Sequence, residues 1–177
     1  LFVIVLGIMG VVATMPTAIH ASKAAPLPAP VTPLLSVSSA YTITDLGTLG
    51  GTQSEAYDII LAGTVVGWSY TSAGAGHAVV WHTAIISGNA VITSTVDLGT
   101  LGGASSTAYG VSGNGHVAGA SPLGSGVVHA FEGSADPLTH LGTLPGGTSM
   151  SSTASDVNSD GIVVGSSVTT NTAPFPA

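Results

Sequence analysis

One stretch of the chain carries oxygen-bearing side chains at the spacing of a cation site. Asp156, Asn158 and Asp160 alternate along the sequence, and Gly161 follows them. Ligands on alternate residues before a glycine let the backbone wrap a hard cation, so these three residues are candidate calcium ligands. A helix–loop–helix calcium site also needs Glu at position 167, which is Ser167 here. The alternative, which we favour, is a hairpin turn that bends at Asp160 and Gly161.

Histidine and aspartate recur at fixed places in similar stretches of the chain. His77 and His129 occupy one such place, and Asp45, Asp97 and His140 occupy another. Imidazole is a common metal ligand and general base. The spacings match no metal motif such as H-x-H or H-E-x-x-H. Because catalysis needs its residues once rather than once per repeat, the recurrence indicates structural hydrogen bonds between strands and loops.

Aromatic residues are the best candidates for contacting a ligand. Trp68, Tyr70 and Trp81 lie close together in a sequence that is otherwise poor in aromatic side chains. If their rings are exposed on one rim, they offer apolar faces with polar edges, which suits a carbohydrate or another protein as partner. Tyr57 and Tyr109 stand at equivalent places, and we expect them to be half-buried strand residues.

The sequence contains no recognisable catalytic constellation. It has no Cys, which excludes a cysteine nucleophile, a disulfide framework and a zinc site built on thiolates. No G-x-S-x-G element occurs, and the glycine-rich LGTLGG element lacks the lysine and the following helix of a phosphate loop. We therefore assign no catalytic residue and no cofactor, with calcium as the one alternative. We expect Gly50 and Gly51 to form a tight turn with positive φ.

Charge excludes two classes of partner. Lys23 is the only basic residue, there are eight Asp or Glu residues, and the formal net charge is −7. Nothing in the chain neutralises a run of phosphates, which excludes nucleic acid as a partner. An anionic membrane surface repels the chain for the same reason.

The N-terminal region is predicted to be an export signal followed by a spacer. Residues 1–14 are continuously apolar and too short to span a bilayer, and small residues follow, so we assign residues 1–24 to a signal peptide-like segment that lacks its true start. An uncleaved anchor and a buried core helix are the alternatives. Residues 25–40 form a Pro-rich linker. The protein is thus expected to be secreted or exposed at the cell surface.

An internal repeat dominates the rest of the chain. DLGTLGG occurs at residues 45–51 and 97–103, and HLGTLPGG at residues 140–147. Leu98 follows Leu46 by 52 residues, and Leu141 follows Leu98 by 43. We delimit repeat 1 at 41–96, repeat 2 at 97–139 and a truncated repeat 3 at 140–177. The extra residues of repeat 1 predict a loop insertion at 83–94, and the three leucines are expected to have similar surroundings.

Each repeat is predicted to form short strands. In repeat 1 these are residues 41–46, 56–60, 64–69 and 77–82, which are rich in β-branched and aromatic residues and separated by glycine turns. No helical periodicity occurs after residue 40. The predicted fold is all-β, with tandem four-stranded antiparallel units that resemble β-propeller blades, two full and one incomplete. A propeller usually needs four or more blades, and this chain has fewer. Three explanations stay open: the chain is a piece of a longer protein, it associates with other chains, or its sheets form a sandwich instead.

The repeat resembles the HAF family of extracellular repeats, found in bacterial exported proteins. The LGTLGG element is followed by an N-x-x-G-x-V-x-G turn, seen at residues 158–165 and less closely at 112–119, and by His-Ala-Phe at 129–131. His77-Ala78-Val79 is a variant of the last element, and repeat 1 has the apolar turn Ile60-Leu61-Ala62-Gly63 in place of the polar one. The resemblance implies export and repeat architecture, and it brings no catalytic residue, substrate or cofactor.

The expected function is that of a non-enzymatic scaffold or binding module. An exported hydrolase is the alternative, with its active site on blade-top loops, for example at 83–94, or in a missing part of the chain. A structural role in a cell-surface assembly is a third possibility. Exposed aromatic residues on one rim favour the binding module, whereas a cluster of acidic residues and histidine in one pocket favours the enzyme.

Overall fold

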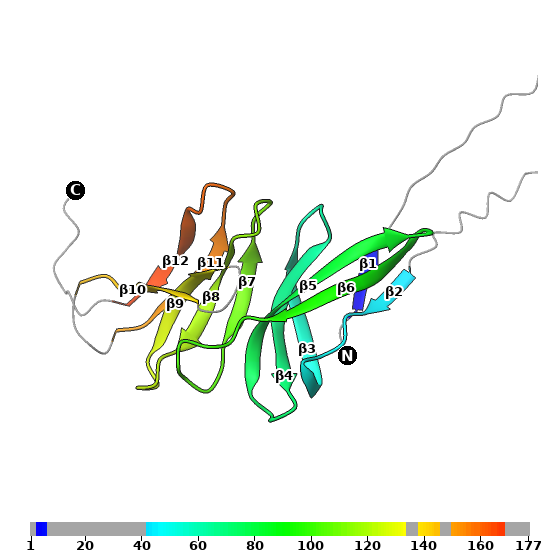
Figure 1. Cartoon of the computed structure of the whole chain (residues 1–177). Coiled ribbons are helices and arrows are strands. Elements are labelled where there is room, and N and C mark those ends of the chain that lie inside the picture. Colours follow the sequence, from blue (N-terminus) through cyan, green and yellow to red (C-terminus); the bar gives the residue numbers. More distant parts are fainter. Residues whose placement is uncertain (1–2, 7–41, 134–137, 146–149, 169–177) are drawn as a thin grey trace, which may run out of the picture.

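The chain folds entirely as β-structure. The structure is a computed structural model that describes residues 3–6, 42–133, 138–145 and 150–168 of the chain. In these residues the backbone forms twelve strands and no helix, so none of them lies in a helix able to cross a membrane. The predicted all-β class is confirmed. Figure 1 shows the sheets side by side in chain order.

The first sheet has four antiparallel strands in the order β3–β4–β5–β6. Its strands are β3 (Gly50–Ile59), β4 (Thr64–Thr71), β5 (Gly76–Ile86) and β6 (Asn89–Asp97). Each of the three turns contains a glycine with positive φ, namely Gly63, Gly74 and Gly88. Glycine adopts this backbone conformation without steric cost, which is why the chain reverses at these places.

Two further sheets follow the same up-and-down plan. The second sheet consists of β7 (Thr107–Val111), β8 (Val117–Pro122), β9 (Val128–Gly133) and β10 (Thr139–Gly142), and the described part of the third consists of β11 (Ser152–Val157) and β12 (Val163–Ser167). The two complete and one incomplete blade-like units expected from the sequence are therefore present. In addition, β1 (Val3–Leu6) pairs with β2 (Thr42–Asp45) beside β6.

The same irregularity occurs in all three sheets. The first strand of each sheet carries a β-bulge opposite a glycine in the second strand, at Gly67, Gly119 and Gly165. A Cβ atom on Gly67 would lie 1.9 Å from the carbonyl oxygen of Glu55, and the corresponding distances at Gly119 and Gly165 are 2.1 and 2.0 Å. No side chain fits there. Glycine at this place in each repeat therefore allows the close approach of the two strands at the bulge.

The sheets pack face to face through their first strands. Strand β7 lies against β3, β4 and β5, and β11 lies against β7, β8 and β9. The main core cluster joins Val66 and Val80 of the first sheet to Val111, Val117 and Phe131 of the second. Full burial of a side chain such as Phe131 stabilises the fold by about 1.5–3 kcal/mol. Each sheet thus hides a face by lying against its neighbour.

The leucines that begin each LGTLGG element occupy equivalent places. Leu46 and Leu98 are buried, and Leu141 is exposed. Each lies near an alanine of the following first strand and a valine of the following second strand, in the sets Leu46–Ala56–Val65, Leu98–Ala108–Val117 and Leu141–Ala154–Val163. Trp81 of β5 also packs against Leu46. Leu141 has no such cover in the described residues, because only two strands of the third sheet lie among them.

Two expectations about individual strands are wrong. Residues 41–46 were expected in the first unit, but β2 pairs with β1 rather than with β3, and the fourth strand of the first sheet is β6. The expected loop at residues 83–94 is instead the extended end of the β5–β6 hairpin, with its turn at Ser87 and Gly88. Of the predicted signal segment (1–24) and linker (25–40), only β1 is among the described residues.

Candidate functional site

The LGTLGG elements are tight loops closed by their own hydrogen bonds. Thr48 Oγ1 donates to the carbonyl oxygen of Gly51 (2.9 Å) and accepts from the N–H of Gly50 (3.2 Å). Gly50 has the predicted positive φ of 95°. The expectation for Gly51 is wrong, because its φ is not positive; a Cβ there would instead lie 2.4 Å from Cβ of Tyr70. The two glycines serve different purposes, namely a turn and a close strand contact.

A serine hydroxyl ties the second and the third of these loops to the preceding sheet. Ser106 Oγ accepts a hydrogen bond from the N–H of Ala78 on β5 (2.7 Å) and donates one to the carbonyl oxygen of Gly99. Ser152 makes the same two bonds in the next repeat, from Ala130 N–H (2.9 Å) and to Gly142 (2.6 Å). The alanine of each His-Ala element is therefore the donor in a bond between sheets. These serines were not among the predicted site residues, although each precedes the bulge glycine of its sheet, Gly119 or Gly165, by 13 residues.

The recurrent histidines bond to the start of the next loop, as their recurrence predicted. His77 Nδ1 lies 2.9 Å from both carboxylate oxygens of Asp97, and Asp97 Oδ1 also accepts from the N–H of Gly99 (2.8 Å). In the second sheet His129 Nδ1 is hydrogen-bonded to His140 Nε2, with the two rings stacked at 4.4 Å. Within the described residues no three His, Asp or Glu side chains gather as a metal site.

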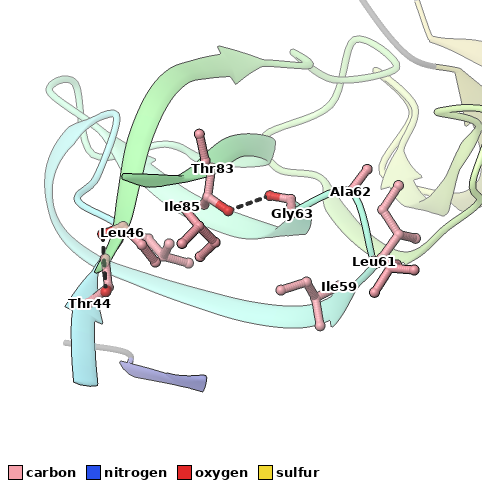
Figure 2. A pocket seen from close by; sticks show the side chains of 11 residues that line it. Thr44, Leu46, Ile59, Leu61, Ala62, Gly63, Thr83 and Ile85 are labelled. Atoms are coloured by element: carbon pink, nitrogen blue, oxygen red, sulfur yellow. Dashed lines mark hydrogen bonds between the residues drawn. The ribbon is translucent and has the colours of Figure 1, made fainter. Parts of the chain in front are cut away.

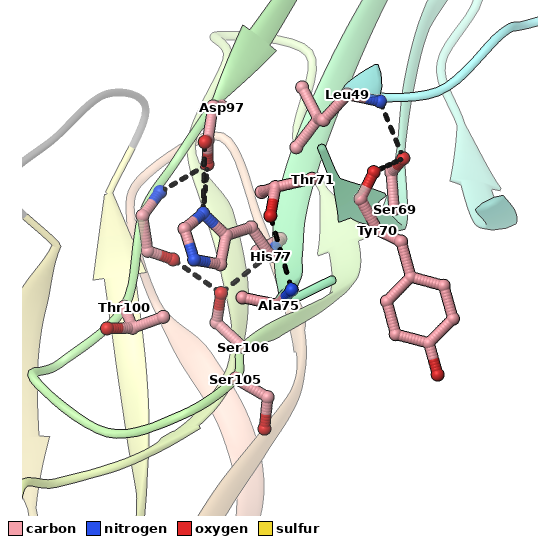
Figure 3. A network of polar contacts seen from close by, with 12 residues as sticks. Leu49, Ser69, Tyr70, Thr71, Ala75, His77, Asp97, Thr100, Ser105 and Ser106 are labelled. Atoms are coloured by element: carbon pink, nitrogen blue, oxygen red, sulfur yellow. Dashed lines mark hydrogen bonds and ion pairs between the residues drawn. The ribbon is translucent and has the colours of Figure 1, made fainter. Parts of the chain in front are cut away.

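Asp97, His77 and Ser106 lie together in a way that resembles a hydrolase triad (Figure 3). A nucleophilic serine needs a hydroxyl that donates to histidine and is reachable by substrate. Ser106 is buried, and its hydroxyl already donates to Gly99 and accepts from Ala78. In the described part of the chain, the imidazole ring of His77 is hydrogen-bonded to Asp97 alone. The arrangement is thus a structural bond network between sheets.

Four aromatic rings form one connected group, in which two rings are hydrogen-bonded to Glu55 and each of these contacts one further ring. We call the group formed by Glu55, Tyr57, Trp68, Tyr70 and Tyr109 the aromatic surface. Tyr57 Oη and Trp68 Nε1 both donate to Glu55 Oε2, at 3.1 and 3.2 Å. Trp68 meets Tyr70 edge to face with ring centres 4.9 Å apart, and the rings of Tyr57 and Tyr109 are 5.5 Å apart. The surface therefore spans the junction between the first and second sheets.

The aromatic surface remains accessible to a ligand. Tyr57 and Tyr109 are strand residues, as expected, in β3 and β7, and with 46% and 38% exposure more than half of each side chain is covered while part of each ring stays accessible. Their places lie at or beside the β-bulges, where the strand turns its side chains outward. Trp68 and Tyr70 are half-buried. Glu55 Oε1 makes no hydrogen bond to any described residue, which leaves it available as an acceptor.

The environment of Tyr57 keeps its hydroxyl protonated. Partial burial raises the pKa of Tyr57 above its ordinary value of 10.0, and the hydrogen bond to the carboxylate of Glu55 raises it further. The phenol is therefore a donor at neutral pH, and Glu55 accepts from it.

Trp81 does not belong to the aromatic surface, and its predicted binding role is wrong. Its side chain is 0% exposed and packs with Leu46, Val65 and Val79 on the other face of the first sheet. Trp68 and Trp81 lie on adjacent strands, where Trp68 pairs with Ala78 and Trp81 pairs with Val65. Residues at odd and even offsets along a strand point to opposite faces, which separates the two tryptophans.

The candidate calcium residues lie in the β11–β12 hairpin. Asn158 Oδ1 accepts from the N–H groups of Asp160 (3.0 Å) and Ile162 (2.8 Å), and Asp156 Oδ1 accepts from Val157 (2.7 Å). Gly161 has φ of 76°, as a tight turn requires. These are the bonds of the hairpin turn that we favoured. Calcium binding by Asp156, Asn158 and Asp160 stays a prediction.

No protein-family model, curated protein or solved structure matches the chain.

Proposed function

We propose that this chain is a non-enzymatic binding module of an exported repeat protein and that its aromatic surface binds uncharged carbohydrate. The observation that carries the proposal is the arrangement of Trp68 and Tyr57 around Glu55. Both rings donate to the same carboxylate oxygen, which fixes their orientation while their remaining surface is accessible. A surface that is ordered before binding loses less conformational entropy when the ligand arrives.

The chemistry of the surface suits a sugar. Sugar rings combine apolar C–H faces with hydroxyl groups at their edges. Aromatic rings cover the first kind of surface, and a carboxylate accepts hydrogen bonds from the second. Glu55 Oε1 is the available acceptor, because the rings of Trp68 and Tyr57 bond to the other oxygen of the same carboxylate, and Tyr109 lies against Tyr57.

The charge of the chain limits the class of carbohydrate. With a formal net charge of −7 and Lys23 as its only cation, the protein repels acidic polysaccharides. Glu55 adds a negative charge at the surface itself. An uncharged polysaccharide is therefore the ligand class that we propose.

The resemblance to the HAF repeats supports the location. Such repeats occur in exported bacterial proteins, and a Ser-, Thr- and Gly-rich chain with one basic residue suits that environment. Uncharged polysaccharides are available to a protein outside the cell. We therefore propose that the module is secreted or displayed at the cell surface.

Affinity electrophoresis tests the proposal. The chain is run in native gels that contain hydroxyethylcellulose, galactomannan or dextran, and retardation in at least one of them is expected. Trp68→Ala is expected to weaken binding by at least about tenfold, as truncation of a central aromatic contact does. Glu55→Gln keeps an acceptor oxygen and is expected to weaken binding less.

Ile86→Ala is the matched control, because Ile86 is an exposed apolar residue at the end of the β5–β6 hairpin, away from the aromatic surface. It is expected to be retarded like the original chain. Equal mobility in all gels, or equal retardation of Trp68→Ala and the original chain, contradicts the proposal.

A further inference from the structure

The two ends of the stack of sheets expose apolar positions that are buried inside it. Ile59, Val111 and Val157 are equivalent at the end of the first strand of each sheet. Val111 and Val157 are only 4% and 5% exposed because the preceding sheet covers them, whereas Ile59 is 44% exposed. Among the described residues only the two-stranded β1–β2 sheet lies at this end, so no complete sheet covers the apolar face of the first sheet around Ile59.

The opposite end shows the reverse relationship. Val66, Ala118 and Val164 are equivalent in the second strand of each sheet. Val66 and Ala118 are 0% exposed because the following sheet covers them, whereas Val164 is 57% exposed. We call the face around Ile59 the leading face and the face around Val164 the trailing face.

The leading face contains an apolar pocket of about 380 Å³. Figure 2 shows Leu46, Ile59 and Ile85 around it, with Leu61 at the β3–β4 turn. Leu61 is fully exposed, and the equivalent turn residues in the other sheets are Gly113 and Ser159. An exposed leucine replaces small or polar residues only at this end, which indicates that the turn contacts another apolar surface.

At the trailing face, too, an exposed apolar residue stands where the other sheets have a polar one. Ile162 is exposed next to Val164, and the equivalent residues are the polar Thr64 and His116. Inside the stack, a residue equivalent to Val164 packs against one equivalent to Ile59. Ala118, for example, lies in one cluster with Val157. The two exposed faces are thus the two halves of a contact that the chain already makes between its own sheets.

The strands at the two ends are complementary as well. The described part of the third sheet consists of a first and a second strand, β11 and β12. Strand β2 ends at Asp45, the equivalent of Asp97 at the end of β6, so β2 holds the place of a fourth strand. It pairs with β1 as β6 pairs with β5, antiparallel. Among the described residues, the trailing end thus presents a first and a second strand, and the leading end presents a pair that includes the place of a fourth strand.

We infer that two copies of this chain associate head to tail, with the trailing face of one copy on the leading face of the next. Each pair of copies then repeats the junction between two sheets of a single chain. Such a heterologous contact extends into a ring or a filament. We assign a second copy of this chain as the partner because, within the chain, the equivalent positions are covered by a sheet of the same kind.

Two charge substitutions on exposed side chains test the inference in the chain of 177 residues. Leu61→Asp places a carboxylate on the leading face, and Val164→Asp places one on the trailing face. Burial of an unpaired carboxylate in an apolar contact is strongly unfavourable. In sedimentation equilibrium the original chain is expected to associate increasingly with concentration, and each variant alone is expected to be monomeric.

The mixture of the two variants is the decisive measurement. Leu61→Asp retains an intact trailing face and Val164→Asp an intact leading face, so their mixture is expected to form a dimer of one copy each that does not extend. Ser125→Asp, in the exposed β8–β9 turn of the middle sheet, is the matched control and is expected to associate like the original chain.

Three results overturn the inference. The first is a monomeric original chain at every concentration. The second is dimerisation of one variant alone, which indicates a symmetric contact of like faces. The third is association that neither substitution weakens, which indicates that other residues hold the copies together.

Discussion

Asp58 of the first sheet bonds directly to Val111 of the second. Its Oδ2 accepts the N–H of Val111 at 2.9 Å, 53 residues further along the chain, while its Oδ1 accepts the N–H of Ile59 at 2.8 Å. The second sheet has Gly110 at the place equivalent to Asp58, and a Cβ on Gly110 would lie 2.7 Å from Asp156 Oδ1 of the third. The side chains at this place therefore join neighbouring sheets, either by a hydrogen bond or by close contact.

Substitution of Asp58 by Ala is expected to destabilise the stack. The N–H of Val111 then loses its acceptor in a buried strand, which costs about 1–3 kcal/mol of unfolding free energy. Urea unfolding followed by circular dichroism measures the change. Asp160→Ala, at an exposed turn residue whose side chain makes no hydrogen bond to the described residues, is the control. Equal stabilities of the two variants contradict the proposed contribution of Asp58.

Ser106→Ala is expected to lower stability by about 2–3 kcal/mol, because it leaves both the N–H of Ala78 and the carbonyl oxygen of Gly99 without their partner. Ser105→Ala is a matched control one residue away, since Ser105 is exposed. Both variants are compared by chemical denaturation. A Ser105→Ala change as large as that of Ser106→Ala shows that the local backbone, rather than the bridging hydroxyl, determines the effect.

The sequence predicted the repeated positions well because the repeat itself reveals them. The glycine turns, the histidines at the loop contacts and the leucines of the LGTLGG elements occupy equivalent places, as expected. The predicted all-β class follows from the same regular spacing. Features that depend on one repeat alone were harder to predict, since no second copy of them exists in the chain for comparison.

The aromatic surface shows why a feature that occurs in one repeat only is hard to predict from the sequence. Trp68 and Trp81 are alike in sequence, but only the strand register places them on opposite faces, and only the stacking of sheets determines which part of each face is covered. Glu55 joins the surface through its cross-strand pairing with Trp68. The extension at residues 83–94 was misread because length alone does not separate a loop from a hairpin. The Ser87-Gly88 turn between two apolar stretches was the available signal.

Gly119→Ala is expected to be much more damaging than Gly126→Ala. A Cβ at Gly119 lies 2.1 Å from the carbonyl oxygen of Thr107, so the β7–β8 pair has to separate. Gly126 has a φ of 87° with open space around it, which limits the cost to about 1–2 kcal/mol of backbone strain. Thermal unfolding of the two variants gives the order. A smaller effect at Gly119 contradicts the close approach at the bulge.

The stability of the protein is expected to fall at high pH through Tyr57. Its pKa in the folded state is raised above the 10.0 of an unfolded tyrosine, so folding favours the protonated phenol. This contribution is fully present below pH 10 and is lost as the pH rises through the folded-state pKa. Tyr57→Phe, which has no proton to lose, is expected to show a shallower decline between neutral pH and pH above 10. Parallel declines in the two proteins contradict this assignment.

The β11–β12 turn is expected to be stabilised by Asn158 with or without calcium. Asn158 Oδ1 already accepts two backbone N–H groups, so coordination of a cation requires it to give up bonds that hold the turn. We expect Asn158→Ala to lower stability by about 0.5–1.5 kcal/mol in the presence of chelator and of millimolar calcium alike. Thermal unfolding under both conditions measures this. A rise in Tm of the original chain with calcium that Asp156→Ala abolishes supports the calcium site instead, because Asp156 would then be a ligand rather than a turn residue.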